Sequence, residues 1–471
     1  MFAVALFCVA CAALWAWRRK NAKTTEPPYF PGGWPIVGHA PNLIGDSCKL
    51  WDGINDLAKQ SYDIGGVVSA SIGPRTVYIV TDPDDSFTVA NTCLEKDGFY
   101  DFAKPWLGEG LVTGQYSIWK SHRKLLNPAF SQTLLDTFIG VFNCQSRKLV
   151  KDLEKEVGKG LFDHWTYTRH NALETICLTA LGVDFTDTNL NSKYVEATEL
   201  ILNTMVERFM KFWWHSPYTF AWSNVKKKQD ACLKILHNMS YTVRIQRFVW
   251  LWTKFKTFMD LLLELSVEKR IFNDREIREH VDTMIVGGHD TSANVLMFTM
   301  ILLGSHPEAQ EKVYIVGGDR DVEKTDLSKL VYLEAVLKES MRVFTIVPVL
   351  ARKLDRDVKL KNYTLSAGRT CFLFVFGLHK HPVWGPDVNE FKPERWLEPG
   401  GLPDNPNAFA AFSVGRRQCI GKAYALMSMK TTLAHVVRSY RIKADHTKVR
   451  LKLDVMLKPD AGHYVSIERR T

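Results

Sequence analysis

A single cysteine near the C-terminus stands in a setting that suits metal binding. Cys419 lies between Gly415 and Gly421, and the segment after it has apolar residues at alternating steps of three and four. This period predicts a helix with one buried face, so Cys419 lies where a loop enters a helix N-terminus. Unpaired N–H groups and the helix dipole favour an anion at that point. The pattern therefore predicts that Cys419 is a thiolate.

The residues around this cysteine suit an iron porphyrin bound through its sulfur. Gly415 allows the turn that brings N–H groups round the sulfur, and Gly421 lets the helix approach a flat macrocycle. Phe412 would shield the sulfur from water, and Arg417 would pair with a haem propionate. A lone cysteine is usually an ordinary buried thiol. A chance match to five constrained positions is rare, however, and favours the metal site.

A long helix with polar residues in its interior is predicted next to this site. The apolar pattern from Asp274 to about Leu303 predicts roughly 30 helical residues, on the order of 45 Å. Gly287 and Gly288 each cost about 1 kcal/mol relative to alanine, which indicates that room is needed beside the backbone. The following Asp290-Thr291 pair supplies a carboxylate and a hydroxyl that would relay protons to oxygen bound at iron. The structural alternative is a polar helix kink.

The run Phe-x-x-Gly-x-Arg-x-Cys-x-Gly resembles the haem-binding loop of the cytochrome P-450 family, and other motifs follow in the family's order. Glu339 and Arg342 share one helical face and can pair. The family has a structural ion network of three residues at this place, and Arg395 fits its third member. The resemblance also implies that Trp119 and Arg123 reach the haem propionates, with Arg352 as a second propionate partner.

The resemblance implies a mainly α fold with a small β region and one haem domain over residues 46–471. The β region would include a hairpin over residues 67–72 and 76–80, and short strands within 358–376. The cofactor would be haem b, bound non-covalently apart from the bond between the Cys419 thiolate and iron. The reaction would insert one oxygen atom of O2 into an apolar substrate. Since no flavin or nicotinamide fingerprint occurs, electrons would come from NADPH through a reductase, with cytochrome b5 as a further partner.

Two short runs resemble the branch of fatty-acid hydroxylases and insect microsomal members: Phe142-Asn143-x-Gln145-Ser146 and Thr179-Ala180-Leu181-Gly182. Many ω-hydroxylases of that branch have a glutamate where Gly287 stands, and this glutamate can esterify the haem. Glycine cannot, so non-covalent haem is predicted. The aromatic-rich residues 205–258 correspond to the substrate-pocket roof and its membrane-facing entrance, although most of these aromatics should be ordinary core.

The sequence of the N-terminal segment predicts a membrane anchor. An apolar run over residues 2–17 would span about 25 Å as a helix, close to the thinner bilayer of the endoplasmic reticulum, and three cations follow it. A signal anchor over residues 1–20 is favoured over a cleaved signal peptide. The positive-inside rule then places the rest of the chain in the cytosol. Residues 21–45 are proline-rich and predict a semi-rigid hinge.

Composition excludes several other classes of protein. The 471 residues are 46% apolar and 24% charged, as in an ordinary globular protein. The nine cysteines are scattered, which argues against a disulfide framework and a zinc site. The net charge of +10 is spread along the chain, which argues against nucleic-acid binding. A basic surface around Arg416 and Lys422 would suit an acidic redox partner, although solvated charges are the default reading.

Three other functions remain open at this point. A haem-thiolate isomerase or dehydratase needs no electron donor, but the intact Asp290-Thr291 pair argues against it. A non-catalytic haem-binding protein would share the fold, and oxygen uptake dependent on NADPH and a reductase would distinguish it from an enzyme. A secreted protein without haem would lose residues 1–20 and show no Soret band.

Overall fold

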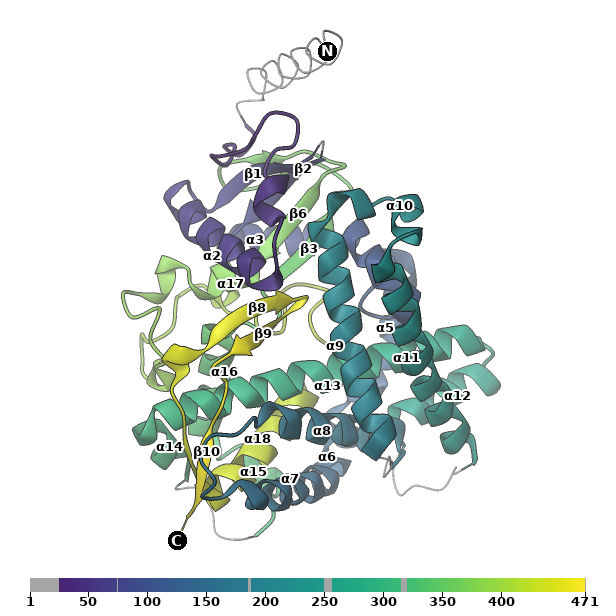
Figure 1. The fold of residues 1–471 in the computed structure, drawn as a ribbon, viewed down its shortest axis with the longest axis vertical. Helices are drawn as coiled ribbons and strands as arrows, with labels where there is room; N and C mark the ends of the chain where they lie inside the picture. The colour runs from purple at the N-terminus through teal and green to yellow at the C-terminus, as the bar shows by residue number, and fades with distance from the viewer. Residues whose placement is uncertain (1–24, 74, 185–187, 250–255, 315–319, 471) are drawn as a thin grey trace.

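The structure is a computed structural model that describes residues 25–73, 75–184, 188–249, 256–314 and 320–470. Within these ranges helices dominate and the strands are short (Figure 1), which confirms the predicted mainly α fold with a small β region. The predicted anchor, residues 1–20, lies outside the described residues. In the described part of the chain, no helix is both long enough and apolar enough to cross a membrane.

The helices and strands cover most of the described chain. The longer helices are α2 (Ser47–Asp63), α3 (Pro83–Thr92), α5 (Tyr116–Leu126), α7 (Ile139–Leu153), α8 (Trp165–Ile176), α9 (Thr188–Met210), α11 (Asn224–Val249), α12 (Phe258–Val267), α13 (Asp274–Ser305), α14 (Pro307–Tyr314), α16 (Val331–Val343) and α18 (Lys422–Ser439). The shorter helices are α4 (Lys104–Leu107), α6 (Gln132–Thr137), α10 (Pro217–Ala221), α15 (Lys324–Leu327) and α17 (Val375–His379). The strands are β1 (Val67–Ile72), β2 (Arg75–Val80), β3 (Val349–Lys353), β4 (Val358–Lys359), β5 (Thr364–Leu365), β6 (Thr370–Phe374), β7 (Tyr440–Lys443), β8 (Arg450–Asp454), β9 (Met456–Ala461) and β10 (Ser466–Arg469).

Several single helical turns connect these elements. They are η1 (Ala40–Leu43), η2 (Gly98–Phe102), η3 (Asn127–Phe130), η4 (Glu154–Glu156), η5 (Cys177–Leu181), η6 (Phe212–Trp214), η7 (Pro382–Trp384), η8 (Pro393–Trp396), η9 (Pro406–Ala408) and η10 (His446–Lys448).

The largest sheet has four strands in the order β1-β2-β6-β3. The hairpin β1–β2 is antiparallel, with Val67 opposite Val80, and this confirms the hairpin predicted from the sequence. Strand β6 joins β2 in parallel, and β3 returns antiparallel to β6 with Leu350 opposite Leu373. The sheet therefore brings the C-terminal half of the chain next to its N-terminal end (Figure 1).

Helix α13 crosses the centre of the molecule and packs against α8, α11 and α16 (Figure 1). Its start is fixed by a capping box, in which Asn273 and Glu276 each accept a hydrogen bond from the other's backbone N–H. Its end at Ser305 lies two residues beyond the prediction. Most of its residues are buried because neighbouring elements cover most of its surface, which explains its apolar composition.

The proline-rich segment is attached to the sheet edge rather than extended freely from it. The backbone N–H of Phe30 donates to the Ser69 carbonyl at 2.7 Å, and that of His39 donates to the Ser71 carbonyl at 2.7 Å. Glu26 forms an ion pair with Arg369 at 3.1 Å. These contacts fix the direction in which the chain leaves the domain toward its N-terminus.

Candidate active site

Cys419 lies in a tight loop directly before α18, as the sequence predicts. Its backbone N–H donates to the Phe412 carbonyl at 2.9 Å, and Gly421 is the N-cap residue of the helix. Gly415 has φ +73°, and a side chain there would place its Cβ 2.9 Å from Asn91 Oδ1. Both the conformation and the space therefore require glycine at this position. At Gly421 a Cβ would meet only the Cys419 sulfur, at 3.8 Å, so no protein contact requires glycine there.

The thiol of Cys419 is exposed to solvent, unlike most cysteines of the described chain. Desolvation by the surrounding loop nevertheless raises the pKa of this thiol, and it outweighs the Gly421 N–H and the charges of Arg123 and Lys422, which lower it. The helix N-terminus therefore does not by itself bring the pKa of Cys419 below its usual value. Loss of the proton depends on iron itself, because a metal ion deprotonates a coordinating thiol.

A group of cations without acidic partners lies near this loop. Arg352 and Arg417 are both buried, and within the described residues no Asp or Glu forms an ion pair with either. The Nε atoms of both, and Nη1 of Arg417, make no hydrogen bond. Burial and the charge of Arg352 lower the pKa of Arg417 to about 10. Burial, followed by the charges of Arg352 and Arg417, holds the pKa of Lys96 well below its usual value.

Buried cations need an anion or a hydrogen-bond acceptor. Arg352 and Arg417, together with the half-buried Lys96, therefore fit the two propionates of a haem, each of which accepts charge-assisted hydrogen bonds. The guanidinium of Arg417 lies 4.6 Å from the Trp119 ring centroid and donates to the Gly114 carbonyl at 2.9 Å. Trp119 thus borders the same group of cations.

Arg123 lies against the cysteine loop instead. Its Nη1 donates to the Gln418 carbonyl at 3.0 Å, and its Nε donates to Asn127 Oδ1 at 2.8 Å. Its charge is among those that lower the pKa of Cys419. Trp119 and Arg123 both lie on α5, but their side chains make different contacts.

Helix α13 has an open face at Gly287. This glycine is exposed although it lies mid-helix among buried residues, and a Cβ there would meet no atom within 4 Å. Thr291 lies one turn further along and is partly exposed, and its Oγ1 donates to the Gly287 carbonyl at 2.6 Å. The predicted room beside the backbone is therefore present, and a hydroxyl borders it.

Asp290 points elsewhere. It is fully buried, and its Oδ2 lies 3.2 Å from Nζ of Lys458, a buried lysine of β9. No hydrogen bond joins Asp290 to Thr291 in the described structure. Burial raises the pKa of Asp290, whereas the charges of Lys458, His289 and Arg169 lower it. The charges have the larger effect, so the pKa of Asp290 lies below its usual value. Asp290 is therefore a carboxylate with a cationic partner of its own.

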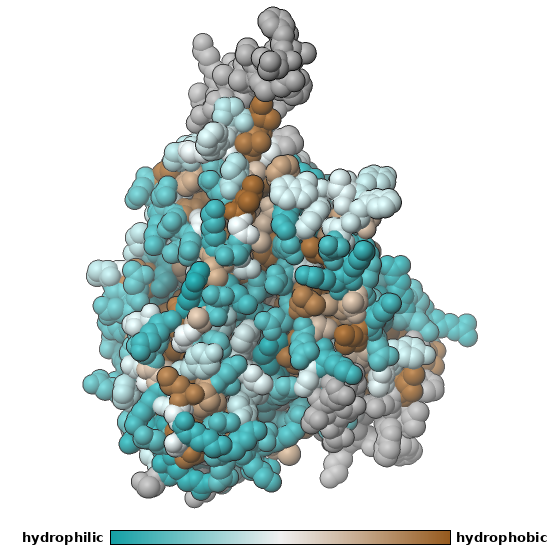
Figure 2. Space-filling view, in the orientation of Figure 1, coloured by the Kyte–Doolittle hydropathy of each residue, from teal (hydrophilic) through white to brown (hydrophobic). Residues whose placement is uncertain are grey.

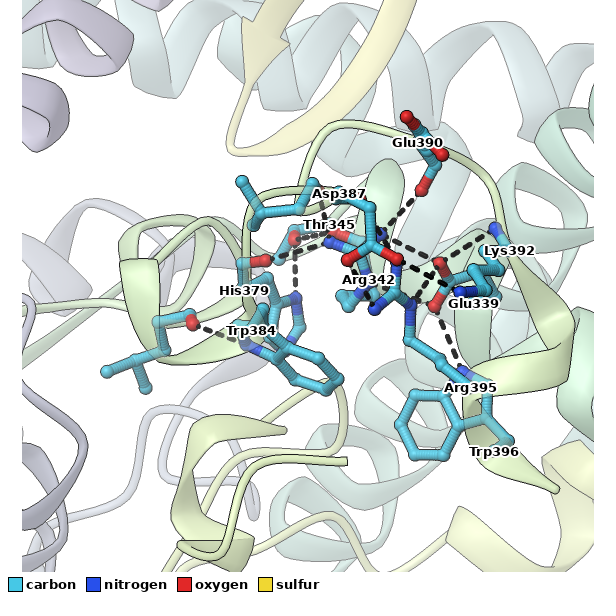
Figure 3. A network of polar contacts seen from close by, with 12 residues as sticks. Glu339, Arg342, Thr345, His379, Trp384, Asp387, Glu390, Lys392, Arg395 and Trp396 are labelled. Atoms are coloured by element: carbon cyan, nitrogen blue, oxygen red, sulfur yellow. Dashed lines mark hydrogen bonds and ion pairs between the residues drawn. The ribbon is translucent and has the colours of Figure 1, made fainter. Parts of the chain in front are cut away.

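Glu339, Arg342 and Arg395 form a closed network (Figure 3). Glu339 accepts from Arg342 at 2.8 and 2.9 Å and from Arg395 Nε at 2.9 Å. The backbone N–H of Lys392 and the indole of Trp396 also donate to Glu339, each at 3.0 Å.

Arg342 in turn reaches carbonyls of the following loop, including those of His379 at 3.1 Å and Val388 at 2.6 Å. The network therefore connects α16 to α17 and η8. All three charged side chains are buried, and their mutual pairing offsets the cost of desolvation.

Two residues of this region were missed by sequence reasoning. Lys96 lies in a loop before η2 with no recognisable motif. Lys458 follows two apolar residues in a strand, and only that apolar setting could have suggested a buried lysine. In both cases the partner group lies far away in the sequence.

Comparisons with known proteins agree with this site. The family model for cytochrome P450 matches residues 27–466. Mouse cytochrome P450 4V2 is 32% identical over 486 residues, covering 97% of this chain and 92% of its own length. Cytochrome P450 4c3 of Drosophila melanogaster is 31% identical over 487 residues, covering 96% of this chain and 91% of its own length. The chain belongs to the cytochrome P450 family.

Membership of this family defines the activity and the cofactor at this site. The protein is a cytochrome P450 monooxygenase with haem b as its cofactor, and a cysteine thiolate binds the iron. A redox partner, O2 and a hydrophobic substrate belong to that chemistry. The cysteine loop, the unpaired cations and the open face of α13 fit the group that this chemistry requires.

Proposed function

We propose that this enzyme hydroxylates a lipid-like or xenobiotic apolar substrate with electrons from NADPH, delivered by NADPH–cytochrome P-450 reductase. The observation that carries the proposal is the exposed thiol of Cys419 together with the buried Arg352 and Arg417, for which the described part of the chain supplies no acidic partner. Haem supplies the binding and activation of O2 when it is bound. Thiolate ligation favours cleavage of the O–O bond, which is the step that an isomerase or a carrier does not need.

The residues round the cofactor have distinct roles in this proposal. Arg352, Arg417, Lys96 and Trp119 would hold the propionates, and Arg123 would hold the cysteine loop through the Gln418 carbonyl. Phe412 packs against the main core and would keep water from the sulfur. Glu339, Arg342 and Arg395 would keep the loops on this side of the domain in place.

Thr291 and Asp290 would supply protons from two different faces of α13. The Thr291 hydroxyl borders the open face at Gly287 and would donate there, while its own oxygen accepts a proton in return. Asp290 is ionised in its pair with Lys458, so it would take up a proton from water after turning away from that lysine and would then pass this proton to Thr291. The ion pair holds the carboxylate on the buried side between turnovers.

The domain would stand on the cytosolic face of the endoplasmic reticulum membrane, with residues 1–20 as anchor, 21–45 as hinge and 46–471 as haem domain. Trp34, Tyr218 and Trp222 are exposed, and α10 lies at the same end of the molecule as β1 and β2 (Figure 1). The surface over this end carries large pale side chains next to the N-terminal segment (Figure 2). Amphipathic aromatic residues favour the membrane interface, which supports this orientation.

Reductase would bind near the cysteine loop, where Arg416 and Lys422 are exposed, and cytochrome b5 is a second candidate for the same surface. The test is reconstitution of the haem-loaded protein with reductase in vesicles. We expect substrate-stimulated oxygen uptake that requires both NADPH and reductase. Turnover of substrate without any electron donor would indicate an isomerase or dehydratase, and absence of uptake with every lipid and xenobiotic tested would indicate a haem carrier.

A further inference from the structure

Arg123 differs from the other two arginines near the cysteine loop. Arg352 and Arg417 are buried, whereas Arg123 is only half-buried. Arg417 borders Trp119, which lies one turn earlier on α5. Arg123 instead donates to the loop and to its own helix. One turn of α5 therefore presents Trp119 to the propionate cations and Arg123 to the loop that holds Cys419.

The contact of Arg123 is with the peptide group that joins Gln418 to Cys419. Its Nη1 donates to the Gln418 carbonyl at 3.0 Å. The N–H of the same peptide group belongs to Cys419 and donates to the Phe412 carbonyl at 2.9 Å. Both polar atoms of this group are therefore fixed, one of them by a cation. Because hydrogen bonds from an ionised donor are about twice as strong as neutral ones, the orientation of this peptide group depends on Arg123.

The guanidinium is held in this place by the end of α5. Asn127 is the C-cap residue of the helix, and its Oδ1 accepts from Nε of Arg123 at 2.8 Å. Its backbone N–H donates to the Arg123 carbonyl, so two hydrogen bonds join these residues. A long arginine side chain otherwise has many rotamers to choose from. Asn127 therefore fixes where the charge of Arg123 lies.

This charge acts on the sulfur of Cys419. Burial lowers the pKa of Arg123, and the charge of Cys419 raises it. Of the two cations that act on Cys419, Arg123 has a larger effect than Lys422. Among the described residues no Asp or Glu forms an ion pair with Arg123. Its positive charge is therefore not cancelled by a neighbour.

We propose that Arg123 raises the reduction potential of the haem iron from its place at the cysteine loop, and that Asn127 is a positioning residue for it. Reduction adds one electron and no positive charge, so the ferrous site is more negative than the ferric site and gains more from a nearby cation. The proposal rests on ligation of the iron by Cys419. Its consequence is an iron that accepts the electron of the reductase more readily.

A spectroelectrochemical titration of the haem-loaded protein gives the midpoint potential and needs neither substrate nor reductase. We expect Arg123→Gln to lower the equilibrium constant for reduction about tenfold, or about 59 mV for one electron. Arg123→Lys keeps the charge and should lower the potential less. Asn127→Ala should also lower it less than Arg123→Gln, because the charge remains but is no longer held in place.

Lys124→Gln is the matched control. It removes the same charge from the next residue of α5, which is exposed and points about 100° away from Arg123. Screening by solvent and salt should keep its effect on the equilibrium constant below about twofold. An unchanged potential in Arg123→Gln, or an equal fall in Lys124→Gln, would overturn the proposal. If Arg123→Gln takes up no haem, Asn127→Ala decides alone, and an unchanged potential there would overturn it as well.

Transfer of haem to apomyoglobin distinguishes this role from that of a propionate partner. Arg123→Gln should lose haem at a rate within about twofold of the wild type, whereas Arg417→Gln should lose it at least about tenfold faster. Loss from Arg123→Gln as fast as from Arg417→Gln would place Arg123 on a propionate and contradict the proposal. Failure of Cys419 as the ligand would show in the wild type itself, as a missing long-wavelength band with carbon monoxide, before any variant is compared.

Discussion

The ammonium of Lys458 lies 3.2 Å from the carboxylate of Asp290, and neither side chain has exposed surface. The pair joins the C-terminal hairpin β8–β9 to the middle of α13. It also places the negative charge of Asp290 on the side of the helix that Thr291 does not face. A buried pair contributes little net stability when intact, but removal of one member leaves an uncompensated charge.

Lys458→Met should therefore lower the free energy of unfolding by about 3 kcal/mol or more, and Asp290→Asn should do the same. The double variant Asp290→Asn/Lys458→Met should recover most of the loss, because no charge is left unpaired. Urea unfolding measures all three. Lys443→Met is the control: Lys443 pairs with Glu468, and both side chains are more than half exposed, so the change should cost at most about 1 kcal/mol. Additive losses in the double variant would show that the two charges are not coupled.

Thr291→Ala should separate oxygen consumption from product formation. The variant lacks the only side-chain hydroxyl assigned here to proton donation at the open face of α13, so product formed per NADPH should fall at least about tenfold while hydrogen peroxide rises. Thr291→Ser keeps a hydroxyl and should stay close to the wild type. The ratio of product to NADPH consumed gives the answer, and tight coupling in Thr291→Ala would remove this residue from the proton path.

Haem should be released completely from this protein by acid extraction into organic solvent. Gly287 has no side chain with which to form an ester, although the space next to it is open. Gly287→Glu is the informative comparison, because its carboxylate would project into that space and should retain part of the haem after turnover. Haem that stays with the wild-type chain in denaturing gels would contradict the prediction.

Acid should destabilise the protein in part through His379. This side chain is buried in the network of Figure 3, where Nε2 accepts from the Ala410 N–H at 2.9 Å and Nδ1 lies 2.6 Å from Thr345 Oγ1. Burial, and then the charge of Arg342, lower the pKa of His379 to about 3 from 6.5. The unfolded chain therefore binds a proton between these two pH values that the folded protein does not, and the free energy of unfolding falls as pH decreases through that window.

His379→Gln should make the free energy of unfolding less dependent on pH. The slope should fall by up to about 1.4 kcal/mol per pH unit, which corresponds to the uptake of one proton. Its amide oxygen can still accept from Ala410. Urea midpoints measured between pH 6.5 and 4 give the two slopes, and identical slopes for wild type and variant would show that His379 takes up its proton in the folded state.

Local sequence patterns were sufficient to predict much of the fold and part of the candidate site. The cysteine loop, the capped helix α13 and the pair of Glu339 with Arg342 all depend on residues a few positions apart, where spacing determines geometry. The third member, Arg395, was identified only through the family resemblance. Partners that meet across the fold, such as Lys458 and Asp290, leave no mark on local spacing.

At two positions the structure adds a physical effect that a local rule omits. The helix N-terminus was expected to ionise Cys419, but desolvation by the folded loop opposes it. Asp290 and Thr291 were predicted to relay protons together, and as adjacent residues on a helix they point about 100° apart. One therefore faces β9 while the other faces the open side of α13.

The bond between Cys419 and iron is tested most directly by the carbon monoxide difference spectrum of the reduced protein. The wild type should show the long-wavelength Soret band that thiolate ligation gives, Cys419→Ala should retain no haem, and Cys419→His should shift the band to the shorter wavelength typical of imidazole ligation. A wild-type protein that binds no haem, or a long-wavelength band that persists in either variant, would contradict the account.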